Sequence, residues 1–391
     1  MRILFVSPFL PYPGVPHAGG KLIFYLLSVL SNRHSIVLLT RVFPGEEIQI
    51  PLLSGMFERV ETIRAPGPIR PHSIRSFCET VASYLRLGHR AKELLRSDQF
   101  DLCQVEYTET AFFSPSRFSV PAVLTCHDVI AKPAYRTFEK SDGIARIKSW
   151  VNWRISLAIE RHAVSKFSRI LVLSEEDEAW AKRLYPGKNY RVLRYPAGVH
   201  FKGIPRKPFP GRVLFVGALN RPQNCDALRF FIQKVWSAVL REVPVAEFCV
   251  VGAGMEGSFM EELATAPRVI VVGQVPDVEP YYASAAVFVA PILSGGGVIV
   301  KVLDALAAGV PTVTTRYGNE GIRARGGEEI VVADNPDRFA EAVIRFLRDP
   351  GFGSDVGAAG RKFVEENFSP AVFEETLERG YRELVSQGGS L

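Results

Sequence analysis

Residues 287–315, VFVAPILSGGGVIVKVLDALAAGVPTVTT, contain the clearest structural pattern in this chain. The first four residues are apolar and end at a proline, which is typical of a buried strand. Three glycines, 295–297, then allow a tight turn and the close approach of a ligand to the backbone. A helix should begin near Val298 and end at Gly309, because Pro311 follows as a stop. The pattern predicts a strand, a glycine loop, a helix and a second strand.

The helix predicted there is amphipathic. Its apolar face should pack on a sheet through residues at i, i+3, i+4 and i+7 spacing, namely Ile299, Val302, Leu303 and Leu306. The opposite face carries Gly297, Lys301 and Asp304. A helix start favours a phosphate, Lys301 adds a full positive charge, and Asp304 can accept hydrogen bonds from sugar hydroxyls. A solvated Lys and Asp on an ordinary helix is the alternative that this stretch alone leaves open.

Length and composition indicate an ordinary globular protein of two domains. The chain has 391 residues, of which 47% are hydrophobic and 23% charged. Its five cysteines are scattered without a C-x-x-C pair, so we expect free thiols in a reducing compartment. Neither a signal peptide nor the run of roughly 18–20 apolar residues that spans a bilayer is evident. We therefore expect a cytoplasmic protein, and its net charge of +6 hints at anionic partners.

The N-terminus reads as the start of a doubly wound sheet. A strand pattern at Arg2–Ser7 is followed by a proline-rich loop, a helix over residues 21–32 and a second strand over residues 35–40. Gly19 and Gly20 stand at the helix entry, where such folds hold ligands, and a plain turn is the alternative. In the resemblance described below they are candidates for an acceptor or phosphate loop.

Two polar residues follow further apolar runs in the first half. Glu106 comes after DLCQV, and His127 lies in VLTCHDV. Residues just past the ends of parallel strands face the ligand crevice of an open α/β sheet. Both are candidate functional residues, and a hydrogen-bonded structural role is the alternative for each.

Residues 131–169 form the most basic segment, with nine Lys or Arg against three Asp or Glu, and they include Trp150 and Trp153. The favoured interpretation is a set of helices with solvated outer faces, whose apolar residues pack inward: Ile147, Val151, Ile155 and Ala158. The alternative is a basic helix with interfacial tryptophans that rests on an anionic membrane surface.

The second half repeats the strand–helix rhythm after a linker. Residues 201–211 are rich in Pro and Gly, and strands are predicted at 212–217, 246–254, 269–275, 287–291 and 311–315, with a helix at Asn224–Arg241 after the first of them. We therefore predict an α/β fold of two Rossmann-like, doubly wound domains, residues 1–200 and 212–369, that face each other across a cleft. The tail from Asn335 to Ser386 should be helical, with Asn335 or Asp334 as the cap.

The second half resembles the nucleotide-sugar domain of retaining glycosyltransferases of family 4, which have the GT-B fold. The matching stretches lie within residues 212–368: FVGALNRPQN, FCVVGAGM, VIVVGQV through TRYGNEGI, and IVVADNPDRFAEAVIRFLRD. The first half matches less tightly, through its glycine loop, VLTCHDV and SRILVLSEED. The resemblance implies that the last helix, within residues 370–391, packs back on the N-terminal domain.

This resemblance implies transfer of a sugar from a UDP- or GDP-sugar, used as substrate, to an acceptor bound mainly by the N-terminal domain. Neither a metal nor another cofactor is expected, because positive side chains and a helix start neutralise the leaving diphosphate. His127 matches a histidine placed near the reacting sugar, and Lys301 is the second candidate catalytic residue. The candidate donor-binding residues are Gly217, Asn220, Arg221, Gly295, Gly296, Gly297, Val298, Lys301, Asp304 and Glu320.

The sequence departs from the family pattern in three ways. Gly296 replaces the first of two glutamates, and Asp304 replaces the second, which usually holds the ribose. The Arg and Lys that usually follow the first strand of the domain are replaced near Ala218 and Gln223, and Arg221 and Lys301 are the nearby substitutes.

The leading hypothesis is a cytoplasmic enzyme that builds a glycolipid or a cell-surface polysaccharide from a glycan or lipid-linked acceptor, with peripheral contact to an anionic membrane. The alternative is a non-catalytic homologue that binds nucleotide sugars or glycans. A nucleic-acid partner is not expected, because no basic groove with interleaved aromatic residues is evident.

Overall fold

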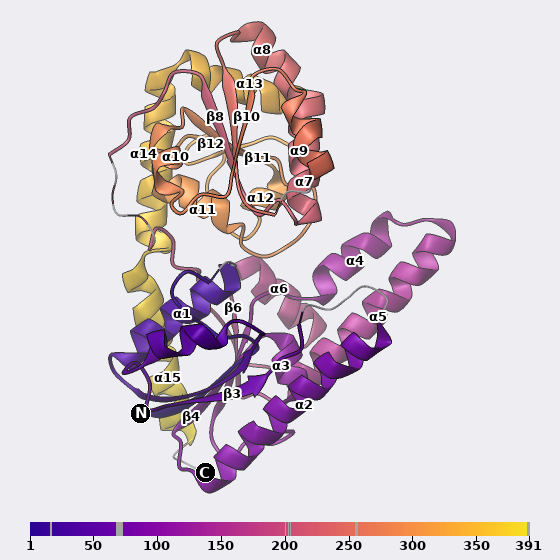
Figure 1. The fold of residues 1–391 in the computed structure, drawn as a ribbon, viewed down its shortest axis with the longest axis vertical. Helices are drawn as coiled ribbons and strands as arrows, with labels where there is room; N and C mark the ends of the chain where they lie inside the picture. The colour runs from indigo at the N-terminus through magenta and orange to yellow at the C-terminus, as the bar shows by residue number, and fades with distance from the viewer. Residues whose placement is uncertain are drawn as a thin grey trace. The chain divides into compact units, whose positions relative to one another are not determined.

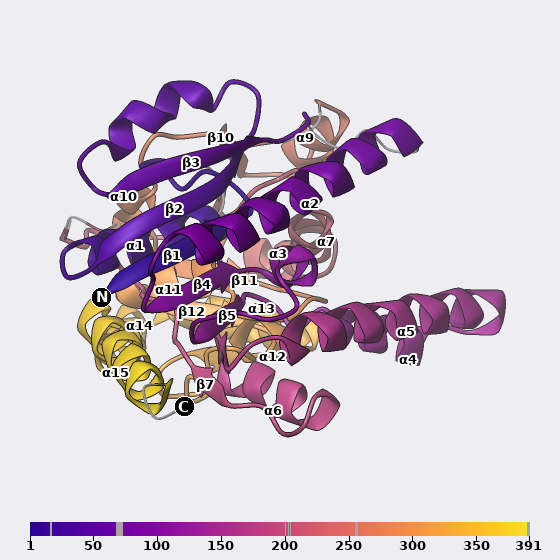
Figure 2. The ribbon, with the colours of Figure 1, turned by 90° about the horizontal axis from the view of Figure 1, so that it is seen from below.

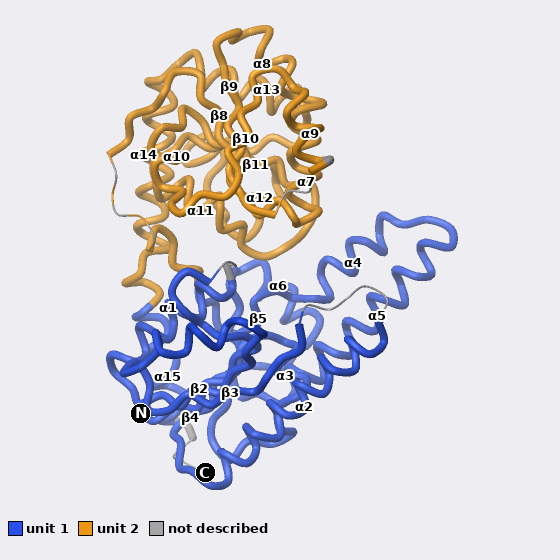
Figure 3. Tube along the Cα trace, in the orientation of Figure 1, with its two compact units in different colours: residues 1–193, 374–391 blue, residues 194–373 orange. Residues whose placement is uncertain are grey.

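The computed structural model describes residues 1–15, 18–67, 73–199, 201, 203, 205–254 and 257–388. The chain divides into two compact units (Figure 3). Unit 1 comprises Met1–Leu193 and Glu374–Leu391, and unit 2 comprises Arg194–Phe373. Each unit contains one parallel sheet with helices on both faces (Figure 1), which confirms the predicted fold class of two Rossmann-like doubly wound domains.

The strands of unit 1 are β1 (Arg2–Ser7), β2 (Ser35–Val42), β3 (Arg59–Arg64), β4 (Leu102–Glu106), β5 (Ala122–Cys126), β6 (Arg169–Val172) and β7 (Tyr190–Val192). They pair in parallel in the order β3-β2-β1-β4-β5-β6-β7. The helices are α1 (Ala18–Ser31), the 3₁₀ turn η1 (Glu47–Leu53), α2 (Ile74–Ser97), α3 (Thr108–Phe113), α4 (Ala131–Lys140), α5 (Gly143–Ser165), α6 (Glu175–Leu184) and α15 (Pro370–Gly388). The strand order reverses between β1 and β4, which places the ligand crevice of such a sheet at their carboxyl ends.

The strands of unit 2 are β8 (Arg212–Val216), β9 (Glu247–Val251), β10 (Val269–Gly273), β11 (Val287–Ala290), β12 (Thr312–Thr314) and β13 (Val331–Val332). They pair in parallel in the order β10-β9-β8-β11-β12-β13, so the order reverses between β8 and β11. The helices are α7 (Pro222–Phe230), the π segment η2 (Phe231–Trp236), α8 (Ser237–Glu242), α9 (Gly257–Ala264), α10 (Glu279–Ser284), α11 (Val300–Ala307), α12 (Arg316–Asn319), α13 (Pro336–Arg348) and α14 (Pro350–Asn367).

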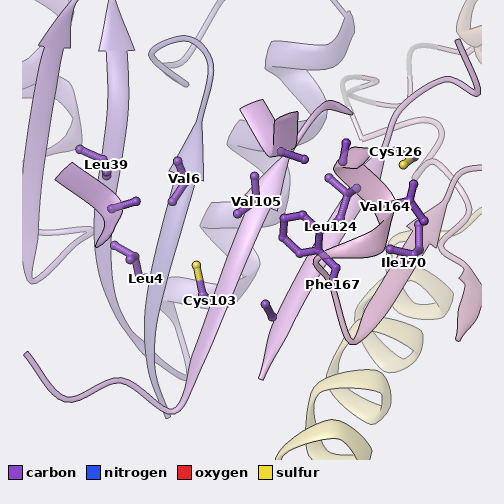
Figure 4. Close-up of a cluster of buried hydrophobic side chains, with 14 of the residues drawn as sticks. Leu4, Val6, Leu39, Cys103, Val105, Leu124, Cys126, Val164, Phe167 and Ile170 are labelled. Atoms are coloured by element: carbon purple, nitrogen blue, oxygen red, sulfur yellow. The ribbon is translucent and has the colours of Figure 1, made fainter. Parts of the chain in front are cut away.

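The core of unit 1 lies on both faces of its sheet. Figure 4 shows one face, where alternate strand residues such as Leu4, Val6, Cys103 and Val105 form a buried cluster. The intervening Ile3 and Phe5 are also fully buried, on the other face. Continuous apolar strands of this kind require helices on both sides of the sheet.

Helix α15 joins unit 1 although it lies at the far end of the chain. The buried carboxylate of Glu378 contacts His34 Nε2 at 2.8 Å, and the Tyr25 hydroxyl donates to Glu374 at 3.3 Å. The guanidinium of Arg169 donates to the carbonyl oxygen of Gly380. These contacts hold α15 against α1 and the start of β6.

The change of unit falls between Leu193 and Arg194. Of the proline-rich stretch predicted as the linker, Lys202 and Ile204 lie outside the described residues, and Arg206 is bonded within unit 2. The Arg206 guanidinium donates to the carbonyl oxygens of Gly309 and Ala285, at 2.5 and 2.6 Å.

The structure differs from the predicted elements at one helix of unit 2 and at one edge strand in each unit. The single helix predicted at Asn224–Arg241 is interrupted by the π segment, whose wide turn keeps Phe231, Val235 and Trp236 buried together. The strands β3 and β13 were not predicted, because β3 alternates charged residues at the edge of its sheet and β13 has only two residues.

The prediction that the apolar residues of α5 pack inward is wrong. Ile147, Val151 and Ile155 are 65%, 42% and 54% exposed, and Ala158 is exposed as well. Figures 1 and 2 show the reason: α4 and α5 pair as a hairpin that extends beyond the sheet of unit 1, so α5 has no sheet beneath its first half. A helical apolar stripe is present, but no part of unit 1 that the structure describes covers it.

In the part of the chain that the structure describes, no helix is both long and apolar enough to cross a membrane. All five cysteines are free thiols, and Cys103, Cys126 and Cys249 are buried. Burial raises the pKa of the Cys249 thiol to about 11, so this group stays protonated near neutral pH.

Candidate functional site

The first cluster of candidate residues lies at the switch point of unit 2, where loops leave the carboxyl ends of β8 and β11. Gly295 and Gly297, in the loop after β11, have φ angles of 120° and 75°, which side chains with a Cβ rarely adopt. Helix α11 begins at Val300, two residues later than predicted, because Ile299 is not yet helical. Gly297 therefore lies in the loop, and the prediction that it shares a helix face with Lys301 and Asp304 is wrong.

Lys301 is held in place by the loop after β8. Its Nζ donates to Asn224 Oδ1 at 2.5 Å and lies 4.5 Å from the centre of the Phe215 ring. Asn224 in turn donates through Nδ2 to the carbonyl oxygen of Ala218 at 2.6 Å. The buried Asn224 amide therefore fixes the ammonium group of Lys301 next to the backbone of this loop. We call Gly217, Asn224 and Lys301 the Lys301 cluster.

The surroundings of Lys301 disfavour the charged form of its ammonium group. Burial, and secondarily the positive charge of Arg221, lower its pKa from 10.5 to about 7. Within the part of the chain that the structure describes, the hydrogen bond of Nζ goes to a neutral amide and not to a carboxylate. A bound anion would supply the missing negative charge, and the start of α11 adds a partial positive charge beside it.

Gly217 leaves the room that the cluster needs. A Cβ at this position would lie 2.7 Å from Lys301 Nζ and 3.0 Å from Asn224 Nδ2. Close by, a Cβ at Gly321 would lie 2.5 Å from the carbonyl oxygen of Gly297. Glycines at these two positions thus allow the Lys301 side chain and the backbone of Gly297 to approach closely.

The remaining candidate donor residues line the same edge of the sheet. Asn220 and Arg221 are exposed in the loop after β8, and Val298 is half-buried in the loop after β11. Half-buried Asp304 lies on α11 near Tyr195, whose pKa is raised by burial and by this carboxylate. The structure places Glu320 at the end of α12, and Gly296 within the glycine loop.

The second cluster lies beside the switch point of unit 1, at the carboxyl ends of β4 and β5. His127 Nε2 is 2.7 Å from Glu106 Oε2, and both side chains are buried. The other carboxylate oxygen of Glu106 accepts from Gln104 Nε2 at 2.7 Å and from Thr125 Oγ1 at 2.9 Å. We call Gln104, Glu106, Thr125 and His127 the His127 cluster.

This network fixes the chemistry of the imidazole. A carboxylate only accepts hydrogen bonds, so His127 Nε2 is the nitrogen that carries the proton toward Glu106. The imidazole nitrogen Nδ1 is then the one left to accept a proton or to contact a ligand. The contact with Glu106 therefore holds the imidazole of His127 in one orientation and favours one tautomer.

Tyr107 covers the imidazole and explains the first predicted glycine. Its ring stacks on that of His127, with 3.8 Å between centroids and 3° between planes. Its φ of 70° is rare for a residue with a side chain, and such strain occurs at functional sites. A Cβ at Gly19 would overlap the Tyr107 hydroxyl, so Gly19 is required here, while Gly20 is buried in the first turn of α1.

Sequence reasoning missed five residues in or beside the two clusters. Gln104, Thr125, Tyr107 and Asn224 are four of them, and the fifth is Tyr381 on α15, whose hydroxyl donates to Gln104 Oε1 at 3.0 Å. A polar residue inside the apolar run DLCQV needs a buried partner, which is a signal that could have identified Gln104. Tyr381 gives no local signal, because its partner lies 277 positions away.

The predicted absence of a metal stays a prediction. Among the described residues, no three His, Cys, Asp or Glu side chains gather as potential metal ligands. The cations at the Lys301 cluster are side chains of the protein itself.

Most of the chain matches two known protein families. Residues 19–201 match the family described as Glycosyltransferase Family 4, and residues 210–349 match Glycosyl transferases group 1. The two matches divide the chain near the point where unit 1 gives way to unit 2.

Two relatives and one solved structure illustrate the similarity. An uncharacterized 44.6 kDa protein in the cps region of Klebsiella pneumoniae is 23% identical over 94% of this chain and 96% of its own length. A GDP-mannose-dependent monoacylated alpha-(1-6)-phosphatidylinositol monomannoside mannosyltransferase of Corynebacterium glutamicum is 30% identical over 37% of this chain and 41% of its own length. Sucrose-phosphate synthase from Thermosynechococcus elongatus shares the fold, with a TM-score of 0.73, 16% identity and coverage of 99% and 100%.

Proposed function

This chain belongs to the group 1 glycosyltransferases of family 4, and we propose that it moves a sugar from a nucleotide-sugar donor to a hydroxyl of a glycan or lipid-linked acceptor with retention of anomeric configuration. The family establishes that the chain is a glycosyltransferase with the GT-B type of fold. The donor, the acceptor and the stereochemical course are the parts that we propose.

The Lys301 cluster is the observation that carries the proposal. A nucleotide sugar presents a diphosphate, and the bond to the sugar breaks with negative charge building on that group. The ammonium of Lys301, the nearby guanidinium of Arg221 and the start of α11 supply positive charge at the switch point of unit 2. Preorganised charge of this kind stabilises a leaving group without reorganisation during the reaction.

In the proposed reaction, the other donor contacts come from the same edge of unit 2. Asp304 accepts hydrogen bonds from the ribose hydroxyls, and Asn220, Glu320, Val298 and the glycine loop 295–297 surround the donor. We assign either UDP or GDP as the nucleotide. The Corynebacterium relative uses GDP-mannose, and we extend only the class of donor, a nucleotide sugar, to this chain.

His127 is the polar group that we propose to act at the sugar. Glu106 orients the imidazole, and Tyr107 covers one of its faces. In a front-face reaction the leaving oxygen and the incoming hydroxyl use the same side of the sugar, so no protein nucleophile is needed. His127 then positions the sugar, with Gly19 and Gly20 in the first turn of α1 close by in unit 1 for the acceptor.

We place the enzyme in the synthesis of a cell-surface polysaccharide or glycolipid, at the cytoplasmic face of a membrane. The Corynebacterium relative is named for a phosphatidylinositol-linked acceptor, which supports an acceptor anchored in lipid. An enzyme with such an acceptor needs a surface that rests on the membrane.

The experiment that tests this function measures release of nucleoside diphosphate from a panel of UDP- and GDP-sugars, with a proton NMR spectrum to assign the anomeric configuration of the product. We expect turnover with one donor, an unchanged anomeric configuration, and a loss of at least about a hundredfold in kcat for His127→Ala. The control is His89→Ala, which removes an exposed imidazole from α2.

Two results would contradict the proposal. An inverted product would rule out the front-face course. Donor binding without measurable turnover would assign the chain to the non-catalytic class of homologues, for which Gly296 in place of a glutamate is the motivating feature.

A further inference from the structure

Helix α5 exposes an apolar stripe to solvent. Ile144, Ile147, Val151 and Ile155 recur at i, i+3, i+7 and i+11, which puts them on one side of the helix. They are 75%, 65%, 42% and 54% exposed, and Trp150 beside them is 47% exposed. We call these five residues the hairpin face. Large apolar side chains gathered in this way mark an interaction surface rather than a chance distribution.

Contacts on the opposite side of α5 show in which direction the hairpin face points. Trp153 stacks on Phe138 of α4, with 5.6 Å between centroids and 7° between planes, and lies 5.1 Å from Tyr135. The guanidinium of Arg146 covers the Phe138 ring at 4.9 Å. Because this aromatic contact holds α5 against α4, the stripe on the other side points away from the hairpin.

Positive charge borders the hairpin face. Lys148 and Arg154 are both exposed, and rotation by 100° per residue puts them on opposite flanks of the stripe. Residues 140–158 contain four basic residues against the single acid Asp142. An apolar stripe with cationic flanks and a tryptophan at its edge is the chemistry of a helix that lies in the interface of an anionic membrane.

We propose that the hairpin face docks this protein on a membrane surface that contains anionic lipid headgroups. The apolar stripe enters the boundary between headgroups and acyl chains, and Lys148 and Arg154 contact lipid phosphates. A second copy of the chain fits this face less well, because a symmetric contact would bring the same cationic flanks together. The inference rests on the proposed function for its purpose, which is to hold the enzyme beside a lipid-linked acceptor.

The test measures co-sedimentation of the full chain with vesicles of phosphatidylcholine alone, and with vesicles that contain 30% phosphatidylglycerol. We expect binding to the anionic vesicles that weakens at 0.5 M salt, because ionic contacts are then screened. Ile147→Glu should weaken binding at least about tenfold. The double variant Lys148→Glu/Arg154→Glu should weaken it at least about 25-fold, since each basic residue near the surface contributes about fivefold.

The control is Val245→Glu, which changes an equally exposed apolar residue (65%) in unit 2 and should leave vesicle binding unchanged. All variants should keep the wild-type melting temperature and the rate of donor hydrolysis in water. The rate of donor hydrolysis separates the docking inference from the proposed function, because it measures the proposed function without any membrane. Donor turnover without vesicle binding would overturn only the docking inference.

Equal binding of the wild type, Ile147→Glu and the charge-reversed variant would overturn the inference, as would the absence of binding to anionic vesicles. Light scattering provides the remaining outcome. A dimer that Ile147→Glu converts to a monomer would assign the hairpin face to a second copy of this chain and would equally contradict membrane docking.

Discussion

At the scale of single residues, Lys301 shows how surroundings change what a side chain can do. Burial and the charge of Arg221 hold its pKa near 7, so the ammonium loses its proton readily in the free protein. The unfolded chain binds that proton up to a pH of 10.5, so this residue makes the folding stability rise with pH between about 7 and 10.5. A group that lowers the folding stability below its shifted pKa in this way is often retained because it binds a ligand.

A first prediction concerns the pH dependence of donor binding. A bound diphosphate favours the charged form of Lys301, so affinity for a nucleotide sugar should be greatest below pH 7. The dissociation constant should rise above pH 7, by up to about tenfold per pH unit, until the pKa of Lys301 in the complex is reached. Isothermal titration calorimetry between pH 6 and pH 9, in two buffers of different ionisation enthalpy, measures both the affinity and the proton taken up.

Lys301→Met is the matched control, because it keeps the length of the side chain without its charge. Its dissociation constant should be high and almost independent of pH in this range. If the variant kept the pH slope of the wild type, the titrating group would be elsewhere, and the assignment of the donor diphosphate to Lys301 would be wrong.

A second prediction contrasts two glycines. A Cβ at Gly217 meets the end of the Lys301 side chain, whereas a Cβ at Gly252 would overlap the backbone carbonyl of Gly217. Gly217→Ala should therefore remain folded but lose donor affinity about as strongly as Lys301→Met does. Gly252→Ala should lower the free energy of unfolding by several kcal/mol, as overpacking against backbone does. Urea denaturation and nucleotide titration of both variants check this, and a stable, fully binding Gly217→Ala would contradict it.

At the scale of elements, the His127 cluster depends on a helix from the other end of the chain. The hydroxyl of Tyr381 on α15 bonds Gln104 on β4, which bonds Glu106, which orients His127 beyond β5. Every member of this chain of contacts is buried. The C-terminal helix thus supports the candidate catalytic residue through two intermediates.

A third prediction follows from this support. Tyr381→Phe should leave Gln104 Oε1 without its donor and lower the free energy of unfolding by about 1–3 kcal/mol. Because the amide of Gln104 can then turn away from Glu106, kcat should fall while KM for the donor stays constant. Chemical denaturation and steady-state kinetics measure the two effects. The control is Tyr25→Phe, which removes the longer 3.3 Å bond from α1 to Glu374. A normal kcat in Tyr381→Phe would show that α15 only stabilises the unit.

At the scale of elements, the sequence predicts buried strands and strand-end residues well, but not edge strands or the partner of an apolar face. Apolar runs such as RILFVS identify buried strands, and the rule for strand ends leads to Glu106 and His127. The charged edge strand β3 has no such signature. The stripe on α5 has the correct period, yet periodicity shows only that a face is apolar. It does not say whether a sheet, a membrane or solvent meets that face, and so the inward packing of Ile147 was predicted wrongly.

The site was only partly predictable for a similar reason. Lys301 follows a glycine loop and could be identified locally. Its partner Asn224 lies 77 positions away, and Tyr381 lies 277 positions from Gln104. Contacts over such distances are set by how strands and helices assemble, which a single sequence does not encode in any local pattern.

At the scale of the whole molecule, the chain uses the same architecture twice for different purposes. Both units reverse their strand order at the centre of the sheet, and each gathers its candidate residues at or beside that point. Unit 2 brings the ammonium group of Lys301 and the guanidinium of Arg221 together with the glycine loop 295–297. Unit 1 builds a rigid, buried network around an imidazole and also carries the hairpin face.

The most direct test of the central claim is a thermal-shift screen of the full chain against nucleotides and nucleotide sugars, with Lys301→Ala measured alongside. A ligand at a hundred times its dissociation constant should add about 2.7 kcal/mol of apparent stability. We predict stabilisation by a single nucleoside diphosphate series and its sugars, and loss of that stabilisation in Lys301→Ala. No stabilisation by any nucleotide, or the same stabilisation in Lys301→Ala, would contradict the donor site proposed at the Lys301 cluster.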